Sequence, residues 1–262
     1  MLIFLHNYIP NPIVFILGPV NVYWYGLLLA VALLIGYWLV GKLAKKRQLP
    51  VGIIESLYIN LAVWGFIGAR LYHVLGERRF YLDNPWQIFA FWQGGLAIHG
   101  ALLAGLLVIL YFAKKRQLNF WELGDVLAAP LILGQAIGRW GNYFNQELFG
   151  KPTNLPWGIP IDIANRPAGF EQFSFFHPTF LYESLWDLAV FAFLLRLFLK
   201  NRKKSGSIFW LYFVLYPLGR LGVEFLRVNA TPLIFGARLP LLVSAILVVV
   251  GAAMSWRSFR RA

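Results

Sequence analysis

The chain has 262 residues, of which 59% are apolar and only 13% are charged, whereas a soluble domain carries about 25% charged residues. Together with a mean hydropathy of +0.62, this composition excludes an ordinary soluble protein and indicates an integral membrane protein. The net charge of +13 does not indicate nucleic-acid binding, because the basic residues stand in short clusters between apolar runs. The lack of cysteine excludes disulfides, thiolate metal sites and a cysteine nucleophile in this chain.

The first segment is expected to lie at the outer membrane interface. Residues 1–20 lack the basic region of a cleavable signal and are interrupted by Pro10, Pro12 and Pro19. A helix needs about 20 apolar residues to cross a bilayer. Seven such runs follow, at residues 21–42, 51–75, 92–112, 122–143, 178–199, 208–226 and 239–256. The predicted fold class is an all-α polytopic integral membrane protein, with residues 1–262 forming a single transmembrane catalytic domain.

Clusters of basic residues predict the orientation of these spans. They follow the first, third, fifth and seventh spans, at residues 42–47, 114–116, 200–204 and 257–261, and hold 14 of the 24 Lys and Arg. The alternate loops hold six. Because loops rich in Lys and Arg stay in the cytoplasm, we expect the N-terminus outside the cell membrane and the C-terminus in the cytoplasm.

The one long stretch between spans, residues 144–177, is then external. It is rich in proline and glycine, with Pro152, Pro156 and Pro160 among them. This composition predicts an ordered, loop-rich external cap rather than a helix.

Four arginines fall within the predicted spans. An arginine at membrane depth costs about 2.5–3.5 kcal/mol and by default marks a functional site. Arg70, Arg139 and Arg220 lie in the outer halves of their spans, whereas Arg196 lies near an inner end, where its side chain can reach the head groups. Further polar residues lie near the outer beginnings of the other spans: Tyr25, His99, His177 and Glu183. We therefore expect a polar layer in the outer half of the bilayer.

The sixth predicted span carries a polar stripe. Tyr216, Arg220 and Glu224 stand four residues apart, which places them on one helix face. Two interpretations stay open at this point. Arg220 and Glu224 could form a buried ion pair that fixes helix packing, or the stripe could belong to a site.

The end of the fourth span is polar as well, in the sequence GRWGNYFNQELFG at residues 138–150. Arg139 and Asn142 share a helix face, and Gly138 and Gly141 would permit close backbone approach. Outer arginines that face a cavity predict an anionic ligand, most simply a lipid phosphate.

His99 lies in the sequence GGLAIHG at residues 94–100. A single histidine in a helix is commonly a structural residue, but within the polar layer a catalytic base is an equal alternative. The four histidines show no HxxH or HExxH spacing, so we expect no metal site. No GxSxG motif is present either. The predicted site therefore consists of arginines and a base, without a nucleophile of its own.

The residues also resemble a known family. GRWGNYFNQELFG looks like the signature of bacterial phosphatidylglycerol–prolipoprotein diacylglyceryl transferases. The similarity extends to VYWYG at 22–26, GGLAIHG at 94–100, HPTFLYE at 177–183 and YPLGRLGVEFLR at 216–227. It covers nearly the whole chain in the expected order. One departure is Phe180, where a polar residue such as glutamine is expected.

The resemblance implies seven spans in the bacterial inner membrane and transfer of the diacylglyceryl group of phosphatidylglycerol to the lipobox cysteine thiol of a prolipoprotein. The products would be a thioether-linked prolipoprotein and glycerol 1-phosphate, in the first step of lipoprotein maturation. The implied partners are phosphatidylglycerol, prolipoprotein signal peptides and the bilayer, with neither a cofactor nor nucleic acid. The lack of cysteine in this chain agrees with a sulfur that arrives on the substrate.

Roles follow for the site residues if this resemblance holds. His99 is expected to accept the thiol proton, Arg139 and Arg220 to hold the phosphate, and Glu224 to orient Arg220. The residues expected to bind phosphatidylglycerol are Tyr25, Arg139, Asn142, Tyr216 and Arg220. The residues expected to support the site or the cap are Asn145, Glu147, Gly150, His177 and Glu183.

The main alternative is a transporter or flippase for anionic lipids or organic phosphates, which could use the same arginines. Such a protein needs charged residues near the midplane, and Asp187 is the clear candidate there.

Overall fold

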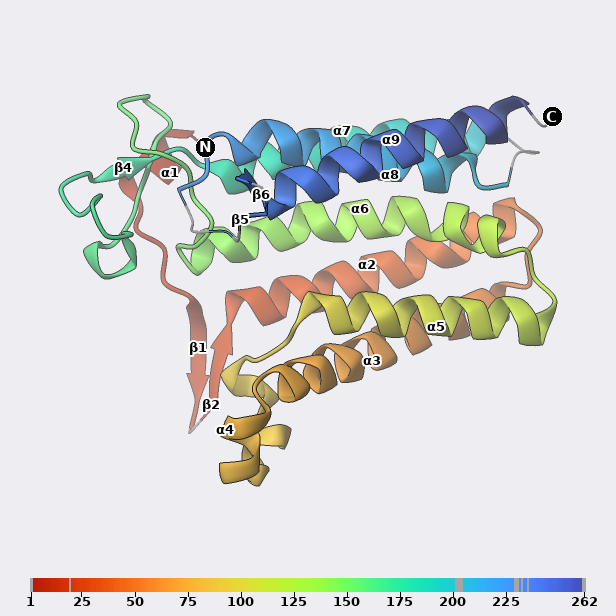
Figure 1. Cartoon of the computed structure of the whole chain (residues 1–262), viewed down its shortest axis with the longest axis horizontal. Helices are drawn as coiled ribbons and strands as arrows, with labels where there is room; N and C mark the ends of the chain where they lie inside the picture. Colours follow the sequence, from red (N-terminus) through yellow and green to blue (C-terminus); the bar gives the residue numbers. More distant parts are fainter. Residues whose placement is uncertain are drawn as a thin grey trace. The chain divides into compact units, whose positions relative to one another are not determined.

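The computed structural model describes residues 2–18, 20–200, 205–228, 231, 233, 234 and 236–260. The sequence predictions that concern Pro19, residues 202–204 and Arg261 lie outside the described residues. Helices dominate the described part of the chain (Figure 1). The long helices are α2 (Trp24–Lys46), α3 (Val51–Gly76), α5 (Ile98–Arg116), α6 (Phe120–Phe144), α7 (Thr179–Lys200), α8 (Ser207–Glu224) and α9 (Leu239–Arg260). The shorter elements are α1 (Leu2–Asn7), β1 (Ile13–Leu17), β2 (Val20–Tyr23), α4 (Arg78–Asp83), η1 (Pro85–Phe89), η2 (Phe91–Gln93), β3 (Ile159–Pro160), η3 (Ile163–Asn165), β4 (Phe175–Phe176), β5 (Leu233–Ile234) and β6 (Ala237–Arg238).

A long helix occupies each of the seven predicted positions, and the all-α polytopic fold class is confirmed. Within the described residues, α2, α3, α5, α6 and α9 are long and apolar enough to cross a membrane. Helices α7 and α8 have 22 and 18 residues but carry charged side chains, among them Glu183 and Asp187 on α7 and Arg220 and Glu224 on α8. The total of seven spans and their orientation stay predictions.

The third predicted span begins later than its sequence suggests. We predicted a start at residue 92, whereas α5 begins at Ile98. Gly94 and Gly95 have φ angles of +94° and +75°, which are incompatible with a continuous right-handed helix. Apolar character alone extends through this turn and does not reveal it.

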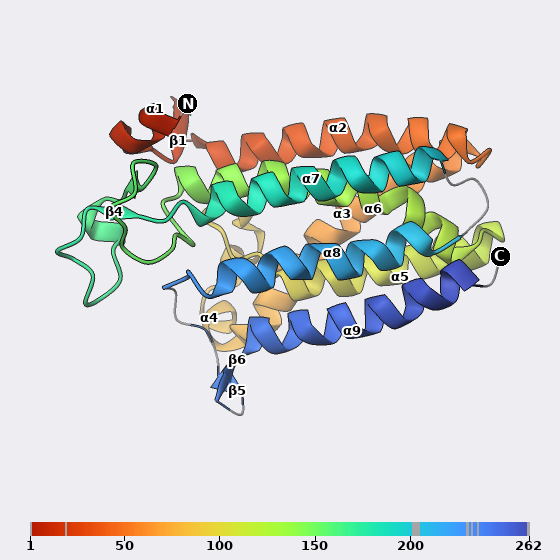
Figure 2. The ribbon, with the colours of Figure 1, turned by 90° about the horizontal axis from the view of Figure 1, so that it is seen from above.

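The chain divides into two compact units. The first contains residues 1–36 and 127–262, and the second contains residues 37–126. In the first unit, α8 packs against both α7 and α9 and lies between them in Figure 2. In the second unit, α3 packs along α5. The prediction that residues 1–262 form a single catalytic domain stays a prediction.

The cap at residues 144–177 is ordered, as the sequence predicts. It contains the antiparallel pair of β3 and β4, in which Ile159 lies opposite Phe176. An apolar cluster joins the cap to α1 and to the adjoining ends of α6 and α7: Leu5, Tyr143, Phe149, Ile159, Ile161, Phe176, Phe180 and Leu181. This cluster fixes the mutual positions of the C-terminal end of α6 and the N-terminal end of α7, where the polar residues of the first unit lie.

Phe180, which departs from the family pattern, is part of this apolar packing. Its ring is 3% exposed, stacks on Tyr143 at 4.7 Å and meets the Trp140 ring edge-on at 5.3 Å. A polar side chain here would need its own hydrogen-bond partner. Phe180 therefore contributes aromatic packing at this position.

Candidate functional site

A carboxylate shared by three arginines lies at the centre of the first unit. Glu183, in the first turns of α7, has a side chain that is 4% exposed. Its Oε2 lies 2.6 Å from Arg139 Nε, and its Oε1 lies 2.9 Å from Arg220 Nη1 and 3.0 Å from Arg227 Nη2. One acidic side chain thus holds guanidinium groups from α6, from α8 and from the segment after α8.

A second glutamate extends this network. Arg220 Nη2 lies 2.8 Å from Glu224 Oε2, one turn further along α8, and Arg238 Nη1 lies 3.3 Å from Glu224 Oε1. Arg220 therefore bridges Glu183 and Glu224. The Arg220–Glu224 ion pair that the sequence suggested is present. It is also part of a larger cluster, so it is not an isolated packing contact.

The network is positively charged. Four arginines, at positions 139, 220, 227 and 238, stand against the two glutamates, which leaves two positive charges in excess. One excess charge remains even if the nearby Asp187 is ionised. Burial lowers the pKa of Arg227 to about 10, so that guanidinium stays charged near neutral pH. Because unbalanced buried charge is costly, this cluster is suited to hold an anion.

Arg139 and Arg220 face the same narrow crevice. Its lining residues are Arg139, Glu183, Trp186, Asp187, Tyr216, Gly219 and Arg220. Tyr216 Oη lies 3.4 Å from Arg139 Nη2. The side chain of Trp186 leaves no room for a Cβ at Gly219, and its Nε1 donates to Leu215 O at 2.8 Å, so this glycine allows α7 and α8 to approach closely.

Asp187 lies one turn along α7 from Glu183 and is 2% exposed. Its Oδ2 has no hydrogen-bond partner among the described residues. The sequence singled out Asp187 only as a midplane charge, and the structure places it in the lining of the arginine crevice.

We expect removal of the Glu183 carboxylate to destabilise the protein strongly. Glu183→Ala leaves the buried Arg139 and Arg227 without their acidic partner, which costs about 3 kcal/mol or more. Glu183→Gln retains an acceptor oxygen and should cost less. Thermal unfolding of the purified protein in detergent would measure both. The exposed Glu77→Gln is the matched control, and an unchanged melting temperature in Glu183→Ala would contradict the central position of this carboxylate.

The head-group contacts predicted for Tyr25 and Asn142 stay predictions. The Tyr25 ring lies against Gly141 so closely that no Cβ would fit there, so the close neighbour of this glycine is a side chain rather than backbone. Gly138 differs, because a Cβ there would meet nothing within 4 Å among the described residues. Asn142 is 7% exposed and donates from Nδ2 to Glu147 Oε1 at 2.8 Å.

Glu147 is the local acceptor in the cap. In addition to Asn142, it accepts a weaker hydrogen bond from Asn145 Nδ2 at 3.4 Å. The neighbouring Gln146, which the sequence analysis did not single out, is buried and ties the cap to the N-terminal segment. Its Nε2 donates to Pro10 O at 2.9 Å, and its Oε1 accepts from Asp162 N at 2.6 Å. The side chains of Asn142, Asn145, Gln146 and Glu147 thus hold the cap over the C-terminal end of α6.

Gly150 joins the cap to the arginine cluster. Its N–H donates to His177 O at 2.9 Å, and it forms an isolated antiparallel bridge with Arg227. A Cβ at Gly150 would lie 2.7 Å from His177 Cβ, 3.0 Å from Thr179 Cγ2 and 3.1 Å from Leu226 O. Only glycine fits between these neighbours without displacing the backbone that carries Arg227.

Gly150→Ala should therefore lower the free energy of unfolding by about 1–3 kcal/mol, the usual cost of overpacking. Gly138→Ala, in the same sequence motif but facing open space, is the matched control and should be neutral, since alanine favours helix. Thermal unfolding would compare the two. Equal melting temperatures for both variants would contradict the close packing at Gly150.

His177 has a structural environment. Its Nδ1 lies 3.2 Å from Tyr182 Oη, and Trp157 Nε1 donates to the same hydroxyl at 2.9 Å. Burial lowers the pKa of His177, so the imidazole is neutral near pH 7. These contacts agree with a supporting role in the cap.

His99 and Arg70 belong to the second unit. His99 is the second residue of α5 and is exposed, with its ring 5.6 Å from the ring of Tyr72. Arg70 is buried, and its guanidinium donates to backbone carbonyls, including Ile88 O at 2.9 Å and Gly94 O at 2.7 Å. Arg70, which the sequence placed in the polar layer by its depth, thus has its donors occupied by backbone carbonyls.

Arg227 and Arg238 were missed as site residues. Both belong to the six basic residues of the alternate loops, since each lies just outside a predicted span. One signal could have found Arg227, because Arg220, Glu224 and Arg227 stand four and three residues apart, as neighbours on one helical face do. Arg238 offers no such signal, because it reaches Glu224 only through the turn between α8 and α9.

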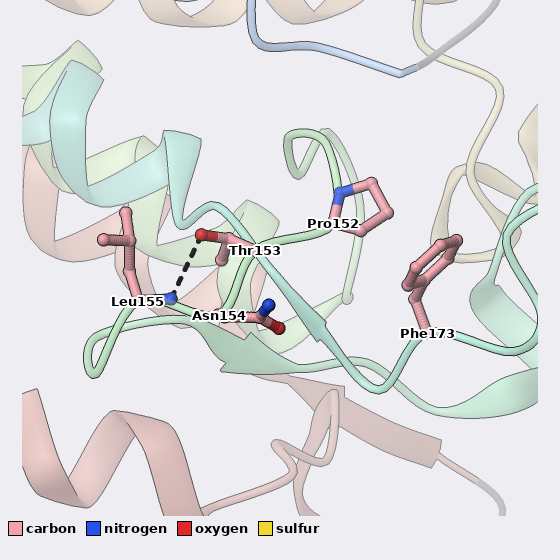
Figure 3. Close-up of a pocket in the computed structure, with 5 residues that line it drawn as sticks. All are labelled: Pro152, Thr153, Asn154, Leu155 and Phe173. Atoms are coloured by element: carbon pink, nitrogen blue, oxygen red, sulfur yellow. Dashed lines mark hydrogen bonds between the residues drawn. The ribbon is translucent and has the colours of Figure 1, made fainter.

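A larger cavity lies in the cap (Figure 3). It has a volume of about 450 Å³ and is lined by Pro152, Thr153, Asn154, Leu155 and Phe173. Thr153 Oγ1 accepts a hydrogen bond from Leu155 N at 3.2 Å. None of the lining residues carries a charge or a base, so this cavity lacks the groups that phosphate-ester chemistry needs.

The helices define a multi-pass membrane protein, and its first unit contains a buried cluster of arginines and glutamates. Residues 12–257 match a family described as prolipoprotein diacylglyceryl transferase. The chain belongs to this family.

Several curated relatives carry the name phosphatidylglycerol–prolipoprotein diacylglyceryl transferase. The protein from Trichormus variabilis is 46% identical over 259 residues, which cover 96% of this chain and 91% of the relative. The protein from Nostoc sp. is 47% identical over 250 residues, covering 94% and 87%. The protein from Synechocystis sp. is 47% identical over 250 residues, covering 93% and 88%. A transporter or flippase is not favoured by these names.

Proposed function

We propose that this protein transfers the diacylglyceryl group of phosphatidylglycerol to the lipobox cysteine of a prolipoprotein. It would act in the bacterial inner membrane, with the cap in the periplasm. The observation that carries this proposal is the excess of two positive charges in a buried cluster whose Arg139 and Arg220 share one crevice. A phospholipid phosphate supplies one of the two missing negative charges, and guanidinium groups bind it with charge-assisted hydrogen bonds.

The proposed reaction is a displacement at the glycerol carbon that bears the phosphate. The substrate sulfur forms a C–S bond as the C–O bond to the phosphate breaks, and the electron pair of that bond leaves with glycerol 1-phosphate. A thiol has a pKa of about 8.5 and becomes a good nucleophile only as the thiolate. His99 would accept its proton.

The arginines would stabilise the charge that grows on the leaving oxygen. Arg139 and Arg220 are held by Glu183, and Arg220 also by Glu224, so their orientation is fixed before substrate arrives. Such preorganised donors lower a barrier more than donors that must first reorient. Tyr216 and Tyr25, beside Arg139, would contact the lipid head group.

Asn142 would have two roles in this proposal, one for each polar atom of its side chain. We expected it to bind the head group, and its Nδ2 donates to Glu147. Its side-chain oxygen would be the group that contacts the lipid, while the amide nitrogen holds the cap. Asn145, Glu147, Gly150 and His177 would then support the cap that covers the site.

The direct test is to incubate the purified protein with phosphatidylglycerol vesicles and a lipobox peptide and to measure the peptide mass. We expect the mass to increase by one diacylglyceryl group, with release of glycerol 1-phosphate. A peptide with serine in place of the cysteine is the control and should not gain mass. If the cysteine peptide stays unmodified and phosphatidylglycerol instead moves from one leaflet of the vesicles to the other, the protein is a lipid transporter.

A further inference from the structure

Arg70 uses its guanidinium to organise one turn of backbone in the second unit. The residue is 8% exposed. Its Nε donates to Ile88 O at 2.9 Å, and its Nη1 donates to Gly94 O at 2.7 Å and Gly95 O at 3.0 Å. Its Nη2 donates to Gln87 O. Four carbonyls from two parts of the α3–α5 connection thus converge on one side chain.

The two residues before Arg70 hold the same segment. The N–H of Ala97 donates to Ala69 O at 3.0 Å. Gly68 packs directly on Gly100, since a Cβ on Gly68 would lie 2.6 Å from Gly100 O. Three consecutive residues of α3 therefore contact the chain on both sides of residue 99.

The turn held by Arg70 has little support of its own. Gly94 and Gly95 adopt the positive φ angles given above and lie in no helix or strand. A Cβ on Gly95 would lie 2.5 Å from Arg70 Nη1 and 2.7 Å from His73 Cδ2, so Arg70 packs tightly onto the turn. Because the carbonyls of this turn are satisfied by Arg70, its shape depends on that side chain.

We propose that Arg70 is a positioning residue for His99. The turn at Gly94 and Gly95 sets where α5 begins, and His99 is the second residue of that helix. His99 itself is exposed and has no hydrogen bond among the described residues, so the backbone fixes its place. This inference rests on the role of His99 as the base in the proposed function.

Lysine cannot replace Arg70 in this role. The guanidinium reaches the four carbonyls with donors arranged in a rigid planar fork, whereas an ammonium group is a compact charge with three donors. Arg70→Lys keeps the charge and much of the side-chain volume but loses the fork. It therefore separates the positioning effect from the effect of charge.

The first experiment measures hydrogen exchange of residues 94–100 in the purified full-length protein. We expect Arg70→Lys to speed exchange in this segment, including the Ala97 amide, while exchange in α7 and α8 stays unchanged. Arg79→Lys, an exposed arginine in α4, is the matched control and should change neither. Unchanged exchange in Arg70→Lys would overturn the anchoring role, whatever the activity.

The second experiment measures transfer kinetics in a double-mutant cycle. A misplacement of about 1 Å can cost on the order of 100-fold in rate, so Arg70→Lys should lower kcat by about 10- to 100-fold and leave KM for phosphatidylglycerol within about twofold. In a His99→Gln background, Arg70→Lys should cause no further loss. An equal loss in both backgrounds would overturn the proposal, because Arg70 would then act independently of His99.

Two outcomes separate this inference from the proposed function. If His99→Gln turns over normally, His99 is not the base, and the proposed function needs another one even if the exchange result holds.

If Arg70→Lys does not fold, Gly95→Ala serves as the second variant, since its Cβ would displace the Arg70 guanidinium. It should give the same exchange pattern and the same cycle, and an additive loss in it would overturn the proposal.

Discussion

Arg220→Ala should lower kcat for transfer by about 100- to 1,000-fold, the effect of removing one preorganised donor from a developing negative charge. Arg220 is the arginine that bridges both glutamates, at 2.9 Å from Glu183 and 2.8 Å from Glu224. Its removal takes one phosphate donor from the crevice and frees Glu183 to turn away from Arg139. We therefore expect kcat to fall and KM for phosphatidylglycerol to rise.

Arg139→Ala should show a similar loss, because Arg139 lines the same crevice. Arg220→Lys should fall between the wild type and Arg220→Ala, since an ammonium cannot contact both glutamates and a phosphate with a planar fork. The assay is transfer from phosphatidylglycerol to a lipobox peptide, followed by mass analysis.

Arg196→Ala is the matched control for these variants. Arg196 is also an arginine within a long helix, but it is exposed on α7, so its removal should leave the rate unchanged. Circular dichroism and thermal unfolding would establish that each variant is folded. Normal turnover in a folded Arg220→Ala protein would exclude Arg220 from the phosphate site.

The convergence of Arg139 and Arg220 was predictable from the sequence because depth can be counted along a helix. The two predicted spans run in the same direction, and both arginines lie a few residues from the same end. The pairing of Arg220 with Glu224 follows from the four-residue spacing on one helix. The depth of a residue in the membrane does not determine the direction in which its side chain points around the helix axis. The structure was therefore needed to show that the two arginines share a crevice.

The position of Glu183 shows the limit of this reasoning. The sequence placed it in the polar layer as a supporting residue, and the structure makes it the common partner of three arginines. Its partners lie on α6, on α8 and in the segment after α8, and no spacing within α7 reveals contacts to other helices. Arg70 shows a second limit. It has the same type of side chain and a similar depth, but its partners are backbone carbonyls, which every sequence contains.

The two glutamates also explain how three largely buried arginines and the partly exposed Arg238 can lie together before substrate binds. Each glutamate offsets part of the repulsion, yet neither provides enough charge to neutralise the set. Two excess positive charges would attract an anionic lipid head group. Complete neutralisation by a third acid would stabilise the empty protein and weaken phosphate binding.

His99→Gln should reduce kcat by about 100- to 10,000-fold, the usual range for loss of a positioned general base. Glutamine retains a polar side chain of similar reach but cannot accept a proton from a thiol at neutral pH. His99 is exposed, so the substitution should leave the melting temperature within about 1 °C of the wild type, because surface changes away from packed features cost little. The variant should depend on the thiolate already present in the peptide. Raising the pH, or using a peptide whose thiol ionises more readily, should therefore rescue the variant more than the wild type.

His6→Gln is the control for replacing a histidine outside the proposed site, since the His6 ring bonds Gly158 O in the cap at 2.8 Å. Substantial activity in His99→Gln with an unchanged pH profile would assign the proton transfer to another group and leave the arginine cluster as the part of the mechanism that stands.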